Sequence, residues 1–198
     1  MIRRIIASRD TEREAASRPR ARLQSGFSLL ELMVALAVGG LLLSLGVPGY
    51  MTVTKNARIV ASANGFLADM HYMRDLAITS NERVVMCPTS SGSGCDAADW
   101  AEGRMVFVDR NADGSPDPGE PIERVSEPAR SLSVQAFAFG GSITYRPNGR
   151  VTTGTGTGAF LMCDDRGSDH ARAVMVDPSG RPRVSHLARV GSTAPCPS

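Results

Sequence analysis

The sequence predicts an α+β protein in which a long N-terminal α-helix, half membrane-spanning and half amphipathic, packs on a small antiparallel head made of two β-sheets. Three features predict this class. Residues 27–47 form an apolar run with a single charge, residues 56–81 carry apolar side chains every three or four positions, and short alternating runs between turn-forming residues follow. We divide the chain into four segments: a leader (1–26), the membrane half of the helix (27–48), its amphipathic half (49–81) and a β-rich head (82–198).

The leader is strongly basic. It contains seven arginines and three acidic residues, which gives it a net charge of +4, whereas the 198-residue chain carries +2 in total. The part of the chain after the leader is therefore net negative. For this reason the charge of the whole chain is no argument for binding nucleic acid.

The apolar run of residues 27–47 is long enough to cross a bilayer. At about 1.5 Å per residue it extends roughly 30 Å as a helix. Because arginines precede it and the charge beyond it is acidic, the positive-inside rule places the leader in the cytoplasm and the head outside. An ordinary secretory signal carries its small residues after the apolar stretch, but here Gly26 precedes it.

The stretch GFSLLELM at residues 26–33 resembles the type IV prepilin signal. The resemblance implies that a prepilin peptidase cleaves after Gly26 on the cytoplasmic face of a bacterial inner membrane, and that the new N-terminal residue, Phe27, is N-methylated. It also implies that Glu31 acts in assembly and that Pro48 ends or bends the membrane half of the helix. The implied partners are the peptidase and other pilins or pseudopilins, contacted through the N-terminal helix.

The carboxylate of Glu31 also indicates assembly on physical grounds. A charged residue in a membrane helix costs about 2.5 kcal/mol or more, so it is expected to have a partner. Cleavage creates the amino group of Phe27 at the same depth, and in a bundle of helices the amine of one subunit can reach Glu31 of its neighbour. The alternative is that Glu31 reaches the lipid headgroups without a partner.

The amphipathic segment of residues 56–81 is expected to cover the head with its apolar stripe. It continues the membrane half after a predicted break around Gly46, Pro48 and Gly49. Met70, Tyr72 and Met73 are expected to pack in the core rather than to hold a cofactor.

Eight strands are predicted in the head, and short antiparallel strands at this spacing favour two packed sheets. Their ranges are 83–87, 104–109, 122–125, 132–137, 142–145, 159–163, 171–176 and 181–185. The head also resembles the family of the type II secretion pseudopilin H (GspH) and the minor pilin FimT. Five segments in the family's order carry this resemblance: RVVMC (83–87), WAEGRMVFVD (100–109), ITYRPNG (143–149), FLMCD (160–164) and AVMVDPSGRPR (173–183).

Four cysteines lie beyond the apolar run, which suits an oxidising compartment. Their spacing favours a disulfide between Cys87 and Cys95 across a Gly/Ser-rich turn, which leaves Cys163 with Cys196. A zinc site is the alternative. No C-x-x-C spacing and no ligand-like spacing of the three histidines supports it.

Residues 109–120, DRNADGSPDPGE, fit the pattern of a calcium-binding loop, with its ligand positions at Asp109, Asn111, Asp113, Asp117 and Glu120. The context fits a calcium site less well, because a strand precedes the loop where an EF-hand has a helix, and two prolines interrupt the loop itself. The alternative is an acidic, turn-rich loop that needs no metal. Beyond this possible calcium, the sequence indicates no cofactor.

Residues 180–183, GRPR, resemble the GRxR motif that contributes to DNA binding in FimT proteins of DNA-uptake systems. Arg181 and Arg183, with a local basic surface to which Arg172, Arg189 and Arg150 would add, would give weak, salt-sensitive contacts to phosphates without base preference. The alternative is that these arginines are simply solvated on an outer strand.

Catalytic residues are not recognisable in a triad or similar arrangement, so the sequence indicates a protein that is not an enzyme. The resemblance implies a minor pilin or pseudopilin subunit of the type II secretion or type IV pilus machinery. The first alternative is a FimT-like minor pilin that binds DNA for uptake in natural transformation. The second is a periplasmic enzyme or sensor that shares only the membrane anchor.

Overall fold

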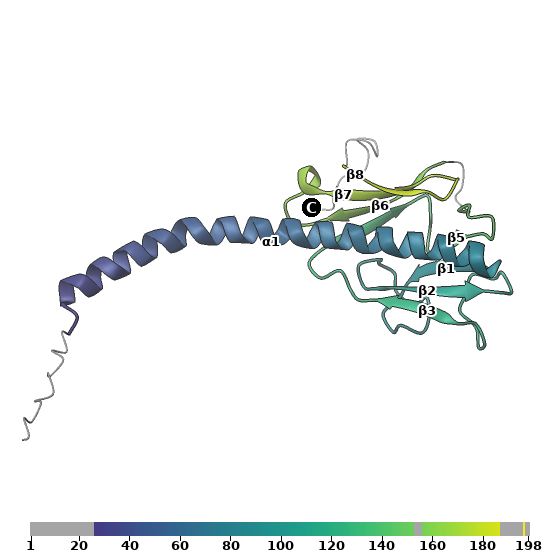
Figure 1. The fold of residues 1–198 in the computed structure, drawn as a ribbon, viewed down its shortest axis with the longest axis horizontal. Helices are drawn as coiled ribbons and strands as arrows, with labels where there is room; N and C mark the ends of the chain where they lie inside the picture. The colour runs from purple at the N-terminus through teal and green to yellow at the C-terminus, as the bar shows by residue number, and fades with distance from the viewer. Residues whose placement is uncertain (1–25, 153–155, 187–195, 197–198) are drawn as a thin grey trace, which may run out of the picture. The chain divides into compact units, whose positions relative to one another are not determined.

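The computed structural model describes residues 26–152, 156–186 and 196 (Figure 1). The chain divides into two compact units, with the boundary between Leu45 and Gly46. The predicted leader before Gly26 lies outside the described residues, and so does Arg189.

One helix, α1 (Leu29–Ser80), has 52 residues and continues through Pro48. The break predicted around Gly46, Pro48 and Gly49 is therefore wrong. A proline inside a helix removes one backbone hydrogen bond and costs about 3 kcal/mol, but strong helical segments on both sides can tolerate that loss. The carbonyl of Pro48 accepts a hydrogen bond from the Thr52 hydroxyl at 3.1 Å. Glycine and proline thus weaken this part of α1 without ending it.

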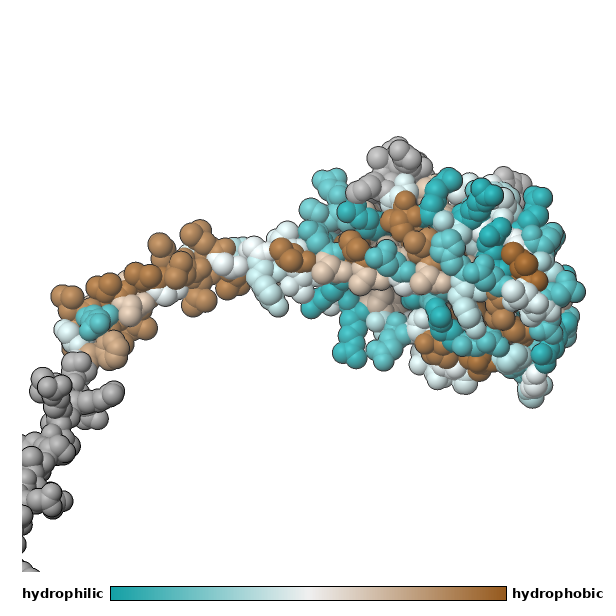
Figure 2. Space-filling view, viewed as in Figure 1, coloured by the Kyte–Doolittle hydropathy of each residue, from teal (hydrophilic) through white to brown (hydrophobic). Residues whose placement is uncertain are grey.

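The first part of α1, up to Leu45, exposes its apolar side chains. Leu29, Leu36 and Leu45 are each more than 65% exposed, and Figure 2 shows hydrophobic side chains all along the visible face of this segment. Among the described residues, α1 is the single helix that is long and apolar enough to cross a membrane. Surface of this kind requires lipid or other apolar helices around it.

The unit that begins at Gly46 contains eight strands in two antiparallel sheets, which confirms the predicted α+β class. The first sheet has the order β3-β2-β1-β5 and the second the order β4-β6-β7-β8. Every strand begins and ends within one residue of its predicted range. The strands are β1 (Arg83–Pro88), β2 (Arg104–Asp109), β3 (Ile122–Ser126), β4 (Ser133–Phe137), β5 (Ile143–Tyr145), β6 (Gly158–Cys163), β7 (Arg172–Val176) and β8 (Pro182–His186), with a short 3-10 helix, η1 (Ser168–His170), before β7.

The core of this unit lies where α1 packs on the sheets. Phe66 of α1 has its ring centroid 5.0 Å from that of Phe160 on β6, which in turn lies 4.6 Å from that of Trp100. Met70 and Met73 are fully buried beside them, as predicted, and Tyr72 is partly buried at the edge of the core. The apolar stripe of residues 56–81 therefore faces the sheets, and its burial is the main force that holds α1 to them.

Two disulfides join Cys87 to Cys95 and Cys163 to Cys196, the pairing that the spacing favoured. Cys163 lies on the face of the second sheet opposite to Phe160, in a separate apolar cluster with Leu161 and Ala173, and Cys196 packs against this cluster. The second disulfide therefore fixes Cys196 against the outer face of the sheet.

Candidate assembly and binding sites

The predicted processing junction, between Gly26 and Phe27, lies just before the first turn of α1. Residues 26–28 are not helical, and Phe27 is 84% exposed. Glu31 lies in the first turn and is exposed, and its side chain makes no hydrogen bond or ion pair with any other described residue. Since Phe27 and Glu31 are four residues apart, an amino group at Phe27 would lie about one helical turn from this carboxylate.

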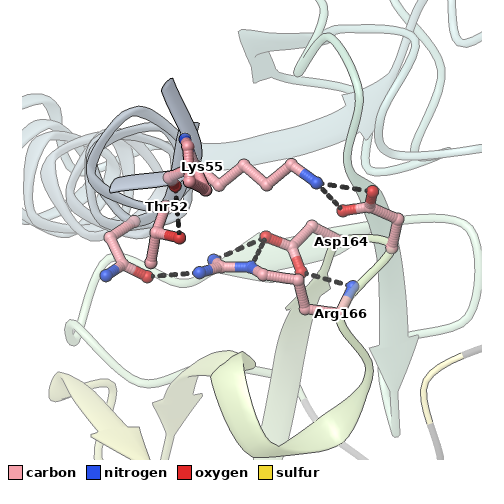
Figure 3. Close-up of polar contacts among 7 residues, drawn as sticks. Thr52, Lys55, Asp164 and Arg166 are labelled. Atoms are coloured by element: carbon pink, nitrogen blue, oxygen red, sulfur yellow. Dashed lines mark hydrogen bonds and ion pairs between the residues drawn. The ribbon is translucent and has the colours of Figure 1, made fainter. Parts of the chain in front are cut away.

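Polar contacts fasten α1 to the segment that follows β6 (Figure 3). Lys55 Nζ lies 2.6 Å from Asp165 Oδ2, and Arg166 donates to Asn56 Oδ1 at 2.8 Å and to Asp164 Oδ2 at 2.6 Å. Burial alone would raise the pKa of Asp164, but the hydrogen bonds from Arg166 outweigh it and lower this pKa below its usual value. The contacts fix this segment against α1 by charge rather than by apolar packing.

A buried ion-pair network joins α1 to the first sheet. Asp69 accepts hydrogen bonds from Arg104 Nε at 2.6 Å, from Arg124 Nη1 at 2.8 Å and from Ser126 Oγ at 3.1 Å. The guanidinium of Arg104 also lies over the ring of Phe66, 4.0 Å from its centroid. One carboxylate on the helix thus fixes β2 and β3 beneath it, and nothing in the sequence pattern singled it out.

The predicted arginine motif begins in the turn between β7 and β8 and continues into β8, which contains Arg183. Arg181 and Arg183 are exposed, while Gly180 has φ +80° and lies so close to the next turn that an added Cβ would be 2.0 Å from the Gly149 carbonyl oxygen. Asp177 closes the turn by accepting from Ser179, and this hydrogen bond lowers the pKa of Asp177. The glycine of the motif is therefore needed for close packing of two turns.

This contact brings further arginines to the motif. Residues 145–151 form a tight turn in which the Arg146 backbone N–H donates to the Arg150 carbonyl at 2.9 Å. Both side chains are exposed, so the packing of Gly180 on Gly149 places two arginine-bearing turns side by side. The sequence analysis included Arg150 but missed Arg146. The sequence RPNG (146–149) is typical of a turn, but only the tertiary contact shows that this turn packs on residues 180–183.

Arg172 does not belong to this surface. In the pairing of β7 with β8, Arg172 lies opposite His186 and Met175 lies opposite Arg183. Since side chains alternate between the two faces of a strand, Arg172 and Arg183 point to opposite faces of the sheet. Grouping Arg172 with Arg181 and Arg183 was therefore wrong, because the sequence does not show the strand register.

The five predicted calcium ligands lie at the end of β2, which contains Asp109, and in the loop that leads from it to β3. Asp109 accepts from the backbone N–H groups of Ala112 at 2.7 Å and Gly114 at 3.2 Å, and Glu120 accepts from that of Asp117 at 3.1 Å. The side-chain amide of Asn111 donates to Asp113 and Asp117. Within the described part of the chain, no group of three or more His, Cys, Asp or Glu side chains is placed to hold a metal ion. The calcium site stays a prediction.

A long N-terminal helix with an apolar first part, a Gly26–Phe27 junction before it and a head of two antiparallel sheets defines a pilin-like protein. The chain belongs to the family described as type II transport protein GspH, which matches residues 62–180. The prokaryotic N-terminal methylation motif matches residues 21–47. Together the two matches identify a minor pilin or pseudopilin of the type II secretion and type IV pilus family.

Two crystal structures of one minor pilin show the same fold. The type IV minor pilin FimU of Pseudomonas aeruginosa is 20% identical and has a TM-score of 0.54, covering 67% of this chain and 92% of that chain. A second crystal form of FimU gives 19% identity and a TM-score of 0.51 over 63% and 90% of the two chains. The minor pseudopilin EpsH of the Vibrio cholerae type 2 secretion system has 10% identity and a TM-score of 0.45, over 65% of this chain and 97% of that chain.

Proposed function

We propose that this chain is a non-catalytic subunit of a type II secretion or type IV pilus filament, cleaved after Gly26, N-methylated on Phe27 and assembled through α1. It resides in the inner membrane as a single-pass protein, with its leader in the cytoplasm and its head in the periplasm. The observation that carries the proposal is the exposed apolar segment of α1, in which Glu31 lies in the first turn just after the cleavage junction. After cleavage, the amine of Phe27 in one subunit pairs with Glu31 of the next.

Substitution of Glu31 by glutamine tests this assembly role, because it removes the charge and keeps the shape of the side chain. We expect Glu31→Gln to be cleaved as in the wild type and to enter filaments at least about tenfold less well, which corresponds to a lost charge pair of about 1.4 kcal/mol. The measurements are mass spectrometry of the N-terminus and immunoblotting of sheared filaments. Normal incorporation of Glu31→Gln would contradict the assembly role.

A matched control separates processing from assembly. Gly26→Val should leave the precursor uncleaved in the membrane, because the bulky residue disturbs the peptidase site and not the helix that follows. An N-terminus at any residue other than Phe27 in the wild-type protein would contradict the whole proposal.

DNA binding is a second candidate function, favoured by the contact between Gly180 and Gly149. This contact brings together the two turns that contain Arg146, Arg150 and Arg181, all three of them exposed, and the exposed Arg183 follows on β8. In this proposal the four arginines contact the phosphate backbone, and such contacts carry no sequence information directly. Such binding would be weak and would fall steeply as salt rises.

A gel shift with double-stranded DNA at low salt tests this second function. We expect the double variant Arg181→Gln, Arg183→Gln to bind DNA at least about tenfold more weakly than the wild type. Each lost phosphate contact reduces the number of counterions released on binding, and this release favours the complex. Arg172→Gln is the matched control because the register places Arg172 on the other face of the sheet. Equal binding by the wild type and the double variant would remove this candidate.

No cofactor is part of the proposed function, and calcium is expected to be dispensable for the loop of residues 109–120. The hydrogen bonds of Asp109 and Glu120 already close this loop. We expect calorimetry to detect no calcium binding and the melting temperature to be unchanged by millimolar calcium. A calcium-dependent rise in melting temperature would instead support the metal site.

A further inference from the structure

A pocket of about 540 Å³ lies between α1 and the segment that follows β3. The charged residues of its lining are mostly arginines: Arg58 comes from α1, Arg104 from β2 and Arg130 from the segment after β3, against the single carboxylate of Glu127. Arg58 and Arg130 are exposed, so they can turn toward a ligand. The pocket therefore favours an anionic group.

Arg104 is fixed at the wall of this pocket. Its Nε and Nη2 atoms both lie 2.6 Å from Asp69 Oδ2, and its side chain is 8% exposed. The guanidinium passes close to Gly65 of α1, where an added Cβ would lie 3.0 Å from Nη2. Since Asp69 also pairs with Arg124, one carboxylate serves two guanidinium groups, and the network keeps a net positive charge.

Ser62 adds a second feature that points to a ligand. Its hydroxyl oxygen is buried and has no hydrogen-bond partner among the described residues, and the residue lines the same pocket. A buried hydroxyl without a partner costs about 1–3 kcal/mol. A carboxylate in the pocket would accept from this hydroxyl and from the arginines, since charge-assisted hydrogen bonds are the strong ones.

The opposite end of the same strand pair is acidic. Arg104 pairs with Ser126 where β2 and β3 meet the pocket, while the loop of residues 109–120 joins the strands at their other end. This loop contains four carboxylates and one arginine, a net charge of −3, and Asp113 and Asp117 are exposed on it. A strand of six residues separates the two ends by roughly 17 Å.

We propose that the pocket receives the acidic β2–β3 loop of a second copy of this chain. A contact between two different surfaces of identical subunits is a head-to-tail contact, which extends into an open filament when the rotation between copies does not close a ring. Strands β2 and β3 run lengthwise beside the part of α1 that covers them (Figure 1), so the repeat direction follows this part of the helix. The inference rests on the proposed function, because it names one partner within the assembly.

A photo-crosslinking experiment on the full-length chain in membranes tests the contact. The crosslinking residue p-benzoylphenylalanine replaces Glu127, an exposed residue of the pocket rim that supplies none of its positive charge. We expect a crosslinked dimer whose digestion with trypsin links the pocket to residues 111–124, the peptide that contains Asp113 and Asp117. The same photoreactive residue at Thr79, an exposed position at the end of α1, is the matched control and should give no such product.

Charge reversal decides whether the carboxylates carry the contact. Arg58→Glu with Arg130→Glu should reduce the dimer yield at least about fivefold, and adding Asp113→Lys with Asp117→Lys to the same chain should restore it. Ser62→Ala should lower the yield without destabilising the head, because its hydroxyl makes no hydrogen bond to lose. Arg146→Glu with Arg150→Glu, the same charge change outside the pocket, should leave the yield unchanged.

Three outcomes would overturn the proposal: no dimer, a dimer linked through another peptide, or a product with a different protein. Processing is checked on the same samples by mass spectrometry of the N-terminus. A correctly cleaved chain that enters filaments without this crosslink would refute the pocket contact and leave the proposed function intact.

Discussion

Asp69 lies on the buried face of α1, where its side chain is 4% exposed and accepts hydrogen bonds from Arg104, Arg124 and Ser126. A buried charge is tolerated only when its partners are close and well aligned. Arg104 in turn is positioned over the ring of Phe66. A single aspartate therefore connects the helix, two strands and the aromatic core.

We expect Asp69→Asn to lower the free energy of unfolding by about 3 kcal/mol, because it leaves the buried guanidinium of Arg104 without a counter-charge. Urea denaturation in detergent micelles measures this, with the fluorescence of Trp100, the single tryptophan of the chain, as the signal. The matched control is Asp165→Asn. Since the Asp165 side chain is 69% exposed, its loss should cost less than about 1 kcal/mol. Similar costs for both variants would contradict this role for Asp69.

Gly180 provides a second test at the scale of residues. Gly180→Ala should lower the free energy of unfolding by at least about 2 kcal/mol, because the new Cβ meets both a positive φ and the Gly149 carbonyl oxygen. Gly167→Ala is the control, since Gly167 has φ +82° with no atom near its Cβ position, and should cost about 1 kcal/mol. Equal losses would show that backbone conformation alone, and not the contact between the turns, requires a glycine at position 180.

Among the elements, α1 has two different surfaces along one continuous helix. Up to Leu45 its apolar side chains are exposed, whereas from Ile59 onward an apolar stripe is buried against both sheets. Each disulfide acts locally on one strand: Cys87–Cys95 closes the turn after β1, and Cys163–Cys196 holds Cys196 against β6. The apolar stripe thus holds the second part of α1 to the sheets, and each disulfide ties one cysteine to a neighbouring segment.

The two disulfides should differ in their contribution to stability. Replacing Cys163 and Cys196 by serine opens a loop of sequence separation 33 and should cost about 3–4 kcal/mol, whereas replacing Cys87 and Cys95 opens a separation of 8 and should cost about 2.5 kcal/mol. Cys87 and Cys163 are both fully buried, so each double variant places one serine at a buried position. The cost of burying a serine is therefore similar in the two variants. Thermal unfolding under non-reducing conditions measures the difference. A larger loss for the shorter loop would show that local packing outweighs loop closure.

At the scale of the whole molecule, the chain contains one unit without a core of its own and one with a complete core. The described residues before Gly46 are exposed or nearly so, while those after it form the apolar core between α1 and the sheets. Stability and assembly therefore depend on different units. Substitutions at Glu31 should change filament incorporation without changing the stability of the head.

The acid stability of the chain follows from carboxylates whose pKa values are lowered by folding. The pKa values of Asp164 and Asp177 are both below the unfolded value of about 3.9. Their contribution is therefore complete above about pH 4 and is lost as the pH falls through the folded values. We expect the melting temperature to drop below about pH 4, and Asp164→Asn to show a smaller drop than the wild type. An unchanged acid profile in Asp164→Asn would contradict the role of its contacts with Arg166.

The sequence by itself determined the elements of this protein: the apolar run, the amphipathic helix and all eight strands. These depend on local patterns, because burial on one face imposes a period of about 3.6 on a helix and of two on a strand. Glu31 and the Gly26–Phe27 junction were recognisable for the same reason, since they lie within a few consecutive residues. The break predicted around Pro48 was wrong, because the low helix propensity of single residues is a weak guide when both flanks are strongly helical.

Only the tertiary structure decided which residues meet. Asp69 reaches side chains 35 to 57 positions away, Gly180 packs on Gly149, and the register of β7 with β8 separates Arg172 from Arg183. The pocket that contains Ser62 and Arg104 likewise joins segments distant in sequence. Such contacts depend on strand order and register, and the alternation within a strand shows which side chains share a face without showing which strand lies beside it.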